Sequence, residues 1–207
     1  MRMQSIFDHG DGWWVDDAFR LSTTKTSALS KQPRMIVLHW TAAPCKSIQE
    51  NLQRITRLAA NDADKKSSHF FILRDGQVWQ MAPTTRATWH AGTSAWTCQD
   101  GTKSSKSVNL FSIGIDFDNV GPITQGKDGM LYDCYGGRFT GVAQEVSGGK
   151  LYESISDNQL WACRVLVDAL RSRFNIPSRD IVGHVDVSPG RKIDPGPLVT
   201  RHTLGME

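Results

Sequence analysis

The segment from Gly183 to Pro197, which reads GHVDVSPGRKIDPGP, places the strongest constraint on the fold. Its glycines and prolines are incompatible with a helix or a strand, so we predict a loop that the prolines keep rigid. The loop carries His184 and Asp194, which are ten residues apart. Imidazole nitrogen and carboxylate oxygen both bind zinc, and a catalytic zinc usually has three protein ligands and one open position. These two residues are therefore candidate metal ligands.

A third ligand must come from another part of the chain, and His39 is the strongest candidate. Residues 35–38 form a continuous apolar run, MIVL, which predicts a buried strand. His39 follows this run directly, and a strand end is a rigid position from which a side chain can point into a cleft. The sequence therefore predicts a site at which this strand end meets the loop.

Composition limits the possible partners. The chain has 207 residues, which is enough for one well-buried domain, and its 39% hydrophobic and 22% charged content is that of a soluble globular protein. A net charge of +3 is too small to indicate nucleic-acid binding, although it would not repel an anionic polymer such as a cell wall. No apolar run is long enough to span a membrane, and the N-terminus has no hydrophobic core of the Sec signal type. We expect no nucleic-acid or membrane partner.

The four cysteines are widely spaced and form no CxxC pair. Without an export signal, we expect free thiols rather than a disulfide framework or a cysteine-based zinc site. The residues concerned are Cys45, Cys98, Cys134 and Cys163.

The hydrophobic pattern interleaves helices and strands. Apolar residues at helical spacing predict amphipathic helices, and Asp157 is the expected N-cap of the second one. A turn signal, Arg74-Asp75-Gly76, separates two strand-like runs and predicts a hairpin. The predicted elements are strand 35–39, helix 47–60, hairpin strands 69–73 and 77–81, strand 111–117 and a helix from 157 to about 174.

This order of elements predicts an α/β fold, a single domain in which a central mixed β-sheet is flanked by helices. Residues 1–33 are irregular and polar, and we expect an N-terminal arm that packs on the domain formed by residues 34–207. Eight glycines fall in the stretch of about 119–154, which we interpret as an inserted loop or hairpin segment.

Five blocks of the sequence resemble, in order, the zinc-dependent N-acetylmuramoyl-L-alanine amidases of the type 2 amidase family. That family includes phage amidase lysozymes, cytosolic amidases of muropeptide recycling and animal peptidoglycan recognition proteins. The final block, HxDxxPGRKxDPGP, is the most specific, and the order and spacing of all five make the resemblance strong. The blocks are His39-Trp40-Thr41 after its strand, Ser67 to Phe70 with Arg74-Asp75-Gly76, Trp89-His90-Ala91-Gly92, Asn109 to Phe117, and Gly183 to Pro197.

Carried over by position, the resemblance implies zinc ligands at His39, His184 and Asp194, the same three residues that the local patterns indicate. It also implies that Asp116 is the general acid–base and that Lys192 stabilises the oxyanion. The remaining implied residues bind substrate: Trp40, Trp89, His90, Ala91 and Gly92.

Two positions depart from the family pattern. The family's acidic residue in the fourth block is glutamate, so the side chain of Asp116 is one methylene shorter. Phage members place a catalytic tyrosine before the second-block histidine, where this chain has Ser68. The second departure assigns proton transfer to Asp116, and the first shortens the distance over which its carboxyl group can act.

Several of these residues also have ordinary structural interpretations. An aspartate on a strand often caps a turn or pairs with an arginine, and Lys192 beside Arg191 resembles a solvated basic pair. Trp40, Trp89 and Trp96 suit core packing as well as stacking on a sugar. We interpret His69 as structural or as a support for a metal ligand, and His90 as a residue of the substrate groove, and we expect His9 and His202 at the surface.

The resemblance implies an enzyme: a bacteriolytic, cell-wall-degrading zinc hydrolase, acting as a monomer. The amidase would cleave the bond between N-acetylmuramic acid and L-alanine in peptidoglycan or muropeptides. Without a Sec signal it would be cytoplasmic, or a phage endolysin, or delivered to the cell wall by another route. The alternative is a non-catalytic peptidoglycan-binding or partner-binding protein of the same fold. Many binding-only members lack a competent third ligand, so Asp194 favours the enzyme.

Overall fold

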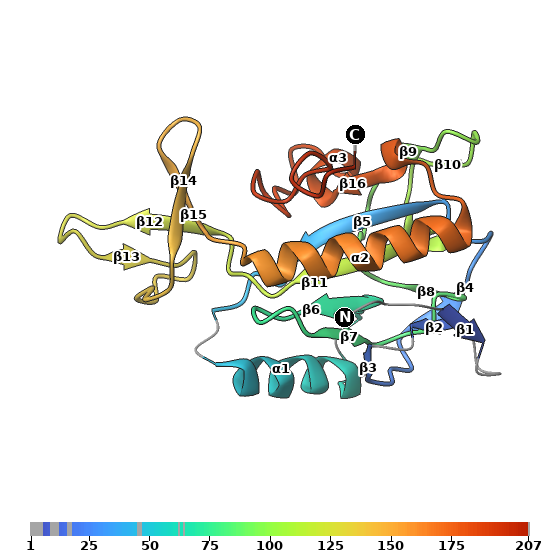
Figure 1. The fold of residues 1–207 in the computed structure, drawn as a ribbon, viewed down its shortest axis with the longest axis horizontal. Coiled ribbons are helices and arrows are strands. Elements are labelled where there is room, and N and C mark those ends of the chain that lie inside the picture. The colour runs from blue at the N-terminus through green and yellow to red at the C-terminus, as the bar shows by residue number, and fades with distance from the viewer. Residues whose placement is uncertain are drawn as a thin grey trace.

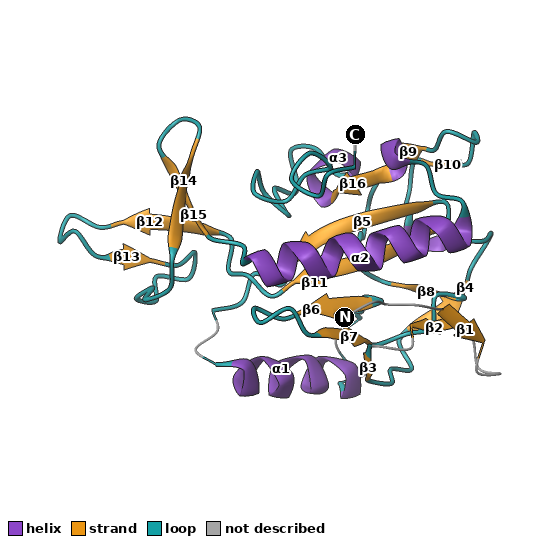
Figure 2. Cartoon of the chain, viewed as in Figure 1, coloured by secondary structure: helices purple, strands orange, loops and turns teal. Residues whose placement is uncertain are grey.

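The computed structural model describes residues 6–8, 13–15, 18–44, 47–61, 63 and 65–206. A six-stranded mixed sheet lies at the centre of these residues (Figures 1 and 2). Its strands, in spatial order, are β16 (Ile181–Gly183), β5 (Met35–Trp40), β11 (Ser112–Phe117), β6 (Phe70–Ile72), β7 (Val78–Gln80) and β3 (Phe19–Arg20). The strands β16, β5, β11 and β6 run parallel, and β7 is antiparallel to β6.

Two longer helices cover opposite faces of this sheet (Figure 1). The side chains of α2 (Asp157–Phe174) pack on Leu38 and Ile115, while Ile55 and Ala59 of α1 (Ile48–Ala60) pack beside Phe71 of β6. The predicted α/β fold with a central mixed sheet is confirmed.

Strand alternation determines which side chains reach the site. Leu38 and Ile115 are register partners that point toward α2, so the next pair, His39 and Asp116, points to the opposite face. On that face the sheet is covered by α1 over one part and by loops over another, where Val37 is buried in a separate cluster. The two polar residues therefore emerge between these covers, at the carboxyl ends of two parallel strands.

The helix and hairpin predictions hold, with one correction. Ser47 caps α1 by accepting a hydrogen bond from Glu50 N at 3.2 Å. The prediction that Asp157 caps α2 is wrong, because Ser156 is the N-cap: its hydroxyl accepts from Gln159 N at 3.1 Å and its own N–H donates to the Gln159 side chain at 3.2 Å. This reciprocal pair satisfies two N–H groups of the first turn, which a single aspartate cannot do.

The inserted segment forms a small sheet of its own. Four antiparallel strands, in the order β13-β12-β15-β14, project from the main body at the left of Figure 1. Arg74 fastens the base of this sheet through Glu153, with Nε–Oε1 and Nη2–Oε2 distances of 2.7 and 2.9 Å, and it also pairs with Asp118. The bounds are β12 (Pro122–Gln125), β13 (Leu131–Tyr132), β14 (Ala143–Val146) and β15 (Lys150–Glu153).

The described part of residues 1–33 contributes strands rather than only a covering arm. Strand β3 forms one edge of the main sheet, and the Val15 amide donates to Gln80 Oε1 at 2.8 Å. His9 lies outside the described residues. The remaining elements are β1 (Ile6–Asp8), β2 (Trp13–Val15), β4 (Thr26–Ala28), β8 (Arg86–Thr88), β9 (Trp96–Thr97), β10 (Lys103–Ser104), α3 (His184–Val187) and two 3-10 turns, Asn109–Phe111 and Ser178–Asp180.

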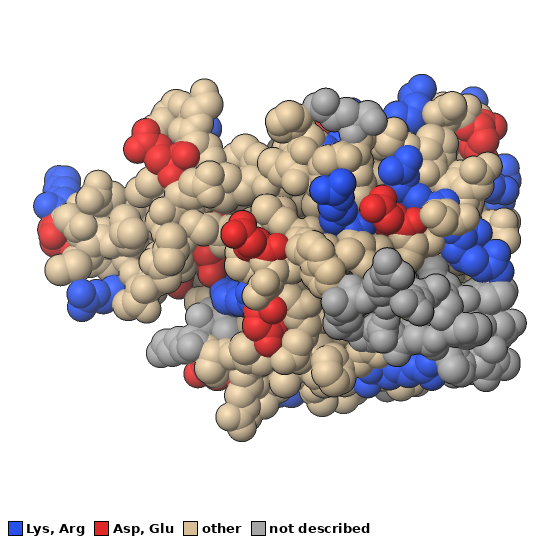
Figure 3. Space-filling model, viewed as in Figure 1, with Lys and Arg blue, Asp and Glu red and all other residues tan. Residues whose placement is uncertain are grey.

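Three of the four cysteines, Cys98, Cys134 and Cys163, are free thiols as predicted, and Cys45 lies outside the described residues. None of the described helices combines the length and the apolar character needed to cross a bilayer. On the face drawn in Figure 3, basic and acidic side chains are interspersed over the described surface, in agreement with the small net charge.

Candidate active site

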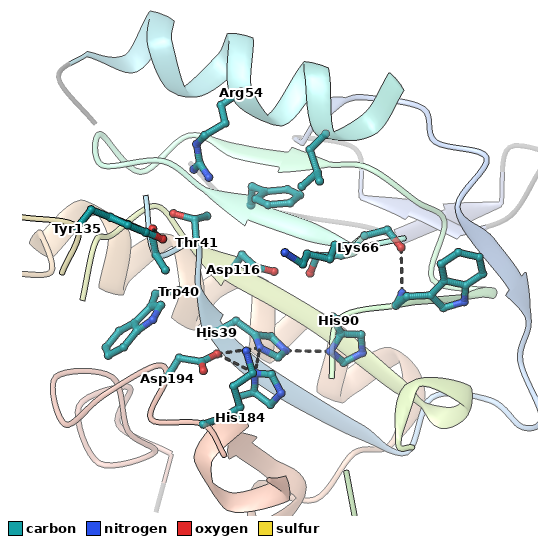
Figure 4. Close-up of a pocket in the computed structure, with 17 residues that line it drawn as sticks. His39, Trp40, Thr41, Arg54, Lys66, His90, Asp116, Tyr135, His184 and Asp194 are labelled. Atoms are coloured by element: carbon teal, nitrogen blue, oxygen red, sulfur yellow. Dashed lines mark hydrogen bonds and ion pairs between the residues drawn. The ribbon is translucent and has the colours of Figure 1, made fainter. Parts of the chain in front are cut away.

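Three potential metal ligands converge at the end of β5 (Figure 4). His39 Nδ1 lies 2.9 Å from His184 Nδ1 and 3.1 Å from Asp194 Oδ2, and His184 Nδ1 lies 2.9 Å from the same carboxylate oxygen. All three side chains are buried. Residues that are 155 positions apart in sequence thus place three donor atoms in one small triangle.

The chemistry of this triangle suits a cation. Lone pairs held about 3 Å apart repel one another unless protons or a metal ion lie among them. Around a tetrahedral zinc with bonds of about 2.0–2.1 Å, ligand atoms are about 3.3 Å apart, so small side-chain shifts would accommodate the ion. Burial alone would raise the pKa of Asp194, but hydrogen bonds from His184 and His39, with a proton on each Nδ1, outweigh it and lower that pKa. A cation that took the place of these protons would stabilise the carboxylate in the same way. The carboxylate is therefore charged, as a cation requires.

His184 is positioned by a short helix that the sequence did not predict. The loop prediction for residues 183–197 is wrong at its start, where α3 forms one helical turn. Prolines begin only at Pro189, and the Asp186 carboxylate accepts from Gly183 N at 2.7 Å, which caps the turn. His184 is the first residue of α3, and its Nε2 lies 3.0 Å from Ala91 O. Because a carbonyl only accepts, this contact places the proton on Nε2 and leaves Nδ1 free to bind a cation.

Arg191 connects the two loops that carry this contact. One of its terminal nitrogens lies 2.7 Å from Ala91 O, 2.6 Å from Thr93 O and 2.7 Å from Ser188 Oγ, and its two hydrogens are shared among these three acceptors. The loop after β8 is thus fastened to the loop that supplies His184 and Asp194. The sequence indicated Arg191 only as a possible solvated residue.

Asp116 lies beside the three donors. It is the register partner of His39 and lines the same cleft, as Figure 4 shows. Burial raises the pKa of Asp116 above its ordinary value, and the neighbouring His39 opposes this shift. A carboxyl group with a raised pKa exchanges a proton nearer to neutral pH than an exposed one does.

The cleft has a volume of about 280 Å³ and is lined by side chains from several separate elements. Lys192, which the resemblance implied, is half-buried in its wall. Among the lining residues that the sequence did not indicate are Arg54 from α1, Lys66 from the segment after that helix, and Tyr135 from the turn after β13 in the insertion. The Tyr135 hydroxyl donates to Ala42 O at 2.7 Å, so the insertion contacts the chain just beyond β5.

The residues expected to bind substrate divide into two groups. Trp89, His90 and Trp40 line the cleft, and Trp89 is 39% exposed. Ala91 is fully buried, and neither Ala91 nor Gly92 belongs to the lining of this cleft. Ala91 instead contacts His184 and Arg191 through its carbonyl oxygen, so the loop supports the candidate metal ligands.

Trp40 satisfies both of its interpretations. One part of the indole lines the cleft, while the ring packs against the backbones of Gly121 and Gly196. A Cβ at these glycines would lie 2.8 and 2.6 Å from Trp40 ring atoms, and both backbones have φ above +70°. The Tyr152 ring lies 6.0 Å away, measured between centroids. Trp40 thereby joins the base of the insertion to the loop that carries Asp194.

His69 is a satisfied structural residue, as expected. Its Nε2 donates to Arg86 O at 2.8 Å, and its Nδ1 accepts from Thr88 Oγ1 at 2.9 Å and from Gly114 N at 3.0 Å. Burial lowers the pKa of His69 from 6.5 to about 4, and the bond to Arg86 partly opposes this shift.

His202 was expected at the surface, and it is exposed.

The lowered pKa of His69 predicts a loss of stability in acid. Because the unfolded chain binds this proton near pH 6.5 and the folded chain only near pH 4, the contribution is complete above pH 6.5 and declines as the pH falls. The His69→Gln variant should lack this dependence, so the free energy of unfolding of the wild type should decline more steeply, by up to about 1.4 kcal/mol per pH unit in this window. Urea unfolding with chelator present, from pH 7.5 to 4, measures both slopes, and parallel slopes would contradict the assignment.

Comparison with known proteins identifies the family. The family described as Amidase_2, N-acetylmuramoyl-L-alanine amidase, matches residues 29–197. The chain belongs to this family. The N-acetylmuramoyl-L-alanine amidase AmiD of Escherichia coli K12 is 28% identical over 194 residues, which cover 89% of this chain and 57% of AmiD. The 1,6-anhydro-N-acetylmuramyl-L-alanine amidase AmpD of Citrobacter freundii is 28% identical over 131 residues, 63% of this chain and 51% of AmpD. The chain therefore spans between half and three-fifths of the length of these relatives.

Solved structures share the fold. An AmpD crystal structure has a TM-score of 0.59 over 97% of this chain and 98% of that chain, at 21% identity. The complex of E. coli AmiD with anhydro-N-acetylmuramic acid-L-Ala-D-gamma-Glu-L-Lys has a TM-score of 0.57 and 26% identity, and the match covers 97% of this chain and 64% of AmiD. These similarities agree with the observed single-domain α/β architecture.

Proposed function

We propose that this protein is a zinc-dependent amidase that hydrolyses the bond between N-acetylmuramic acid and L-alanine in peptidoglycan or muropeptides. The observation that carries the proposal is the convergence of His39, His184 and Asp194, with the Asp116 carboxyl beside them in one cleft. Family membership and the substrate named in the AmiD complex support this choice of bond. A protein that only binds peptidoglycan would not need the third donor, Asp194.

Each residue of the site has a distinct task in this reaction. When bound, zinc lowers the pKa of a coordinated water to about 7 and polarises a carbonyl oxygen. His39, His184 and Asp194 would hold the ion. Asp116 accepts a proton from the attacking water as its oxygen bonds to the carbonyl carbon. The Lys192 ammonium donates to the oxyanion that develops on the carbonyl oxygen during this attack. The oxyanion collapses as the carbon–nitrogen bond breaks, and the Asp116 carboxyl returns its proton to the departing amine nitrogen of L-alanine.

The products distinguish this activity from other cell-wall hydrolases. Digestion of peptidoglycan should release free L-alanine N-termini, because the amide nitrogen is the leaving group, and should create no new reducing sugar ends. N-terminal labelling and a reducing-sugar assay measure the two products. New reducing ends would indicate glycan cleavage, and D-alanine or diaminopimelate N-termini alone would indicate a peptidase.

Substrate preference distinguishes an endolysin or delivered enzyme from a recycling amidase. Intact sacculi and soluble anhydromuropeptides can be compared as substrates, with mass spectrometry of the products. Preference for sacculi is expected of an endolysin or a delivered enzyme, and preference for the soluble compounds is expected of a recycling amidase. No turnover of either, together with measurable binding to sacculi, would favour the non-catalytic alternative.

A further inference from the structure

We infer that His90 and Ser112 form a hydrogen-bond relay that holds His39 in the tautomer whose Nδ1 is free to bind a cation. Neither residue is among the three candidate ligands, and the relay would make both of them positioning residues. The inference rests on the metal-binding part of the proposed function and is independent of which bond is hydrolysed.

The relay begins at a backbone carbonyl. Ser112 is fully buried, and its Oγ lies 2.8 Å from Val108 O. A hydroxyl carries one hydrogen and a carbonyl can only accept, so this hydrogen is committed to Val108. The same Oγ lies 3.0 Å from His90 Nε2 and has lone pairs left to accept. The proton in this second contact must therefore belong to His90 Nε2.

The position of the proton on His90 determines the tautomer of His39. A neutral imidazole with its proton on Nε2 presents a lone pair at Nδ1. His90 Nδ1 lies 2.9 Å from His39 Nε2, which must then be the donor. With its proton on Nε2, His39 presents a lone pair at Nδ1, the atom that faces His184 and Asp194.

Burial makes the relay necessary. His39 is 3% exposed, so water cannot easily replace His90 as the partner of its Nε2. If His90 carried its proton on Nδ1 instead, His39 Nε2 would have to accept, and the proton moved to His39 Nδ1 would block coordination. The carbonyl of Ala91 holds His184 in the corresponding tautomer. Both imidazoles are thus set by backbone carbonyls, His184 directly and His39 through two intervening side chains.

The relay predicts that a residue remote from the ion controls its affinity. Ser112→Ala removes the acceptor for His90 Nε2 and should weaken zinc binding by about 10–100-fold, the usual effect of losing such a supporting partner. Ser112→Thr keeps a hydroxyl and should retain most of the affinity. Ser94→Ala is the matched control, because Ser94 is also a buried serine whose hydroxyl bonds backbone groups. Its Oγ donates to Gly92 O and accepts from Val108 N, and neither bond involves His90.

Zinc affinity is measured by competition with a chromogenic chelator, after circular dichroism has established that each variant is folded. Nitrogen-15 NMR of the zinc-loaded wild type reads the tautomers directly and needs no variant, and protons on Nε2 of both His39 and His90 are expected. A folded Ser112→Ala variant with wild-type affinity, or a proton on His90 Nδ1 in the loaded protein, would overturn the relay while leaving the amidase proposal intact. A wild-type protein that binds no zinc would overturn both.

Discussion

Asp194→Ala is expected to lose most of its zinc and to hydrolyse muropeptides about 10³-fold more slowly or worse. The Asp194 carboxylate contributes the negative charge among the three donors, and its Oδ2 lies within 3.1 Å of both imidazole nitrogens. Without it, two neutral imidazoles must hold a divalent cation in a buried site. Loss of the ion removes several kcal/mol of transition-state stabilisation, and each 1.36 kcal/mol changes the rate tenfold.

Elemental analysis after dialysis against a weak chelator, combined with product assays, tests this expectation. The wild type should retain close to one zinc per chain. Asp186→Asn is the matched control, since it removes a carboxylate from the same loop but keeps an oxygen that can accept from Gly183 N. This variant should bind zinc as the wild type does. Full zinc retention by Asp194→Ala would remove Asp194 from the set of ligands.

The convergence of the three donors was predictable because each lies in a locally determined element. An apolar run preceding His39 specifies a buried strand, and alternation along that strand fixes the face to which the side chain points. The segment that carries His184 and Asp194 is restricted by its prolines, so few backbone conformations compete. Within that segment the helical turn α3 was missed, since it is stabilised by a cap in which Asp186 accepts from Gly183 N, and four residues give no periodic signal.

The wall of the cleft was not predictable in the same way. Arg54 lies on a helix whose amphipathic pattern is clear, but that pattern does not show how the helix is placed relative to the site. Tyr135 reaches the cleft because its sheet is held to the main body by contacts between sequence-distant residues, such as the pairing of Glu153 with Arg74, 79 positions away, and its own bond to Ala42 O. Ser112 gave no signal either, because a buried serine at a strand start is recognisable as functional only when its partner His90 is seen.

The N-cap of α2 illustrates a limit of local rules. Ser156 and Asp157 are both good capping residues, and a choice between them depends on which one pairs with the residue three positions later. Gln159 pairs with Ser156, and its side-chain amide also donates to Ile72 O and Asp118 O. Contacts to β6 and to the residue just after β11 therefore orient this glutamine, and the cap depends on tertiary structure.

Asp116→Asn is expected to bind zinc normally and to lose activity by about 10²–10⁴-fold, the usual contribution of general acid–base catalysis. Asparagine preserves the size of the side chain beside His39 but can neither accept the proton of water nor return one to the amine. Asp116→Glu restores the family's longer acid and should keep substantial activity, because its carboxyl group still enters the cleft lined by Lys192 and the three donors. Zinc content and single-turnover rates on a muropeptide separate metal loss from loss of proton transfer. Wild-type turnover by Asp116→Asn would assign the proton to another group, and inactive Asp116→Glu with full zinc would mean that the position of this carboxyl group is as critical as its charge.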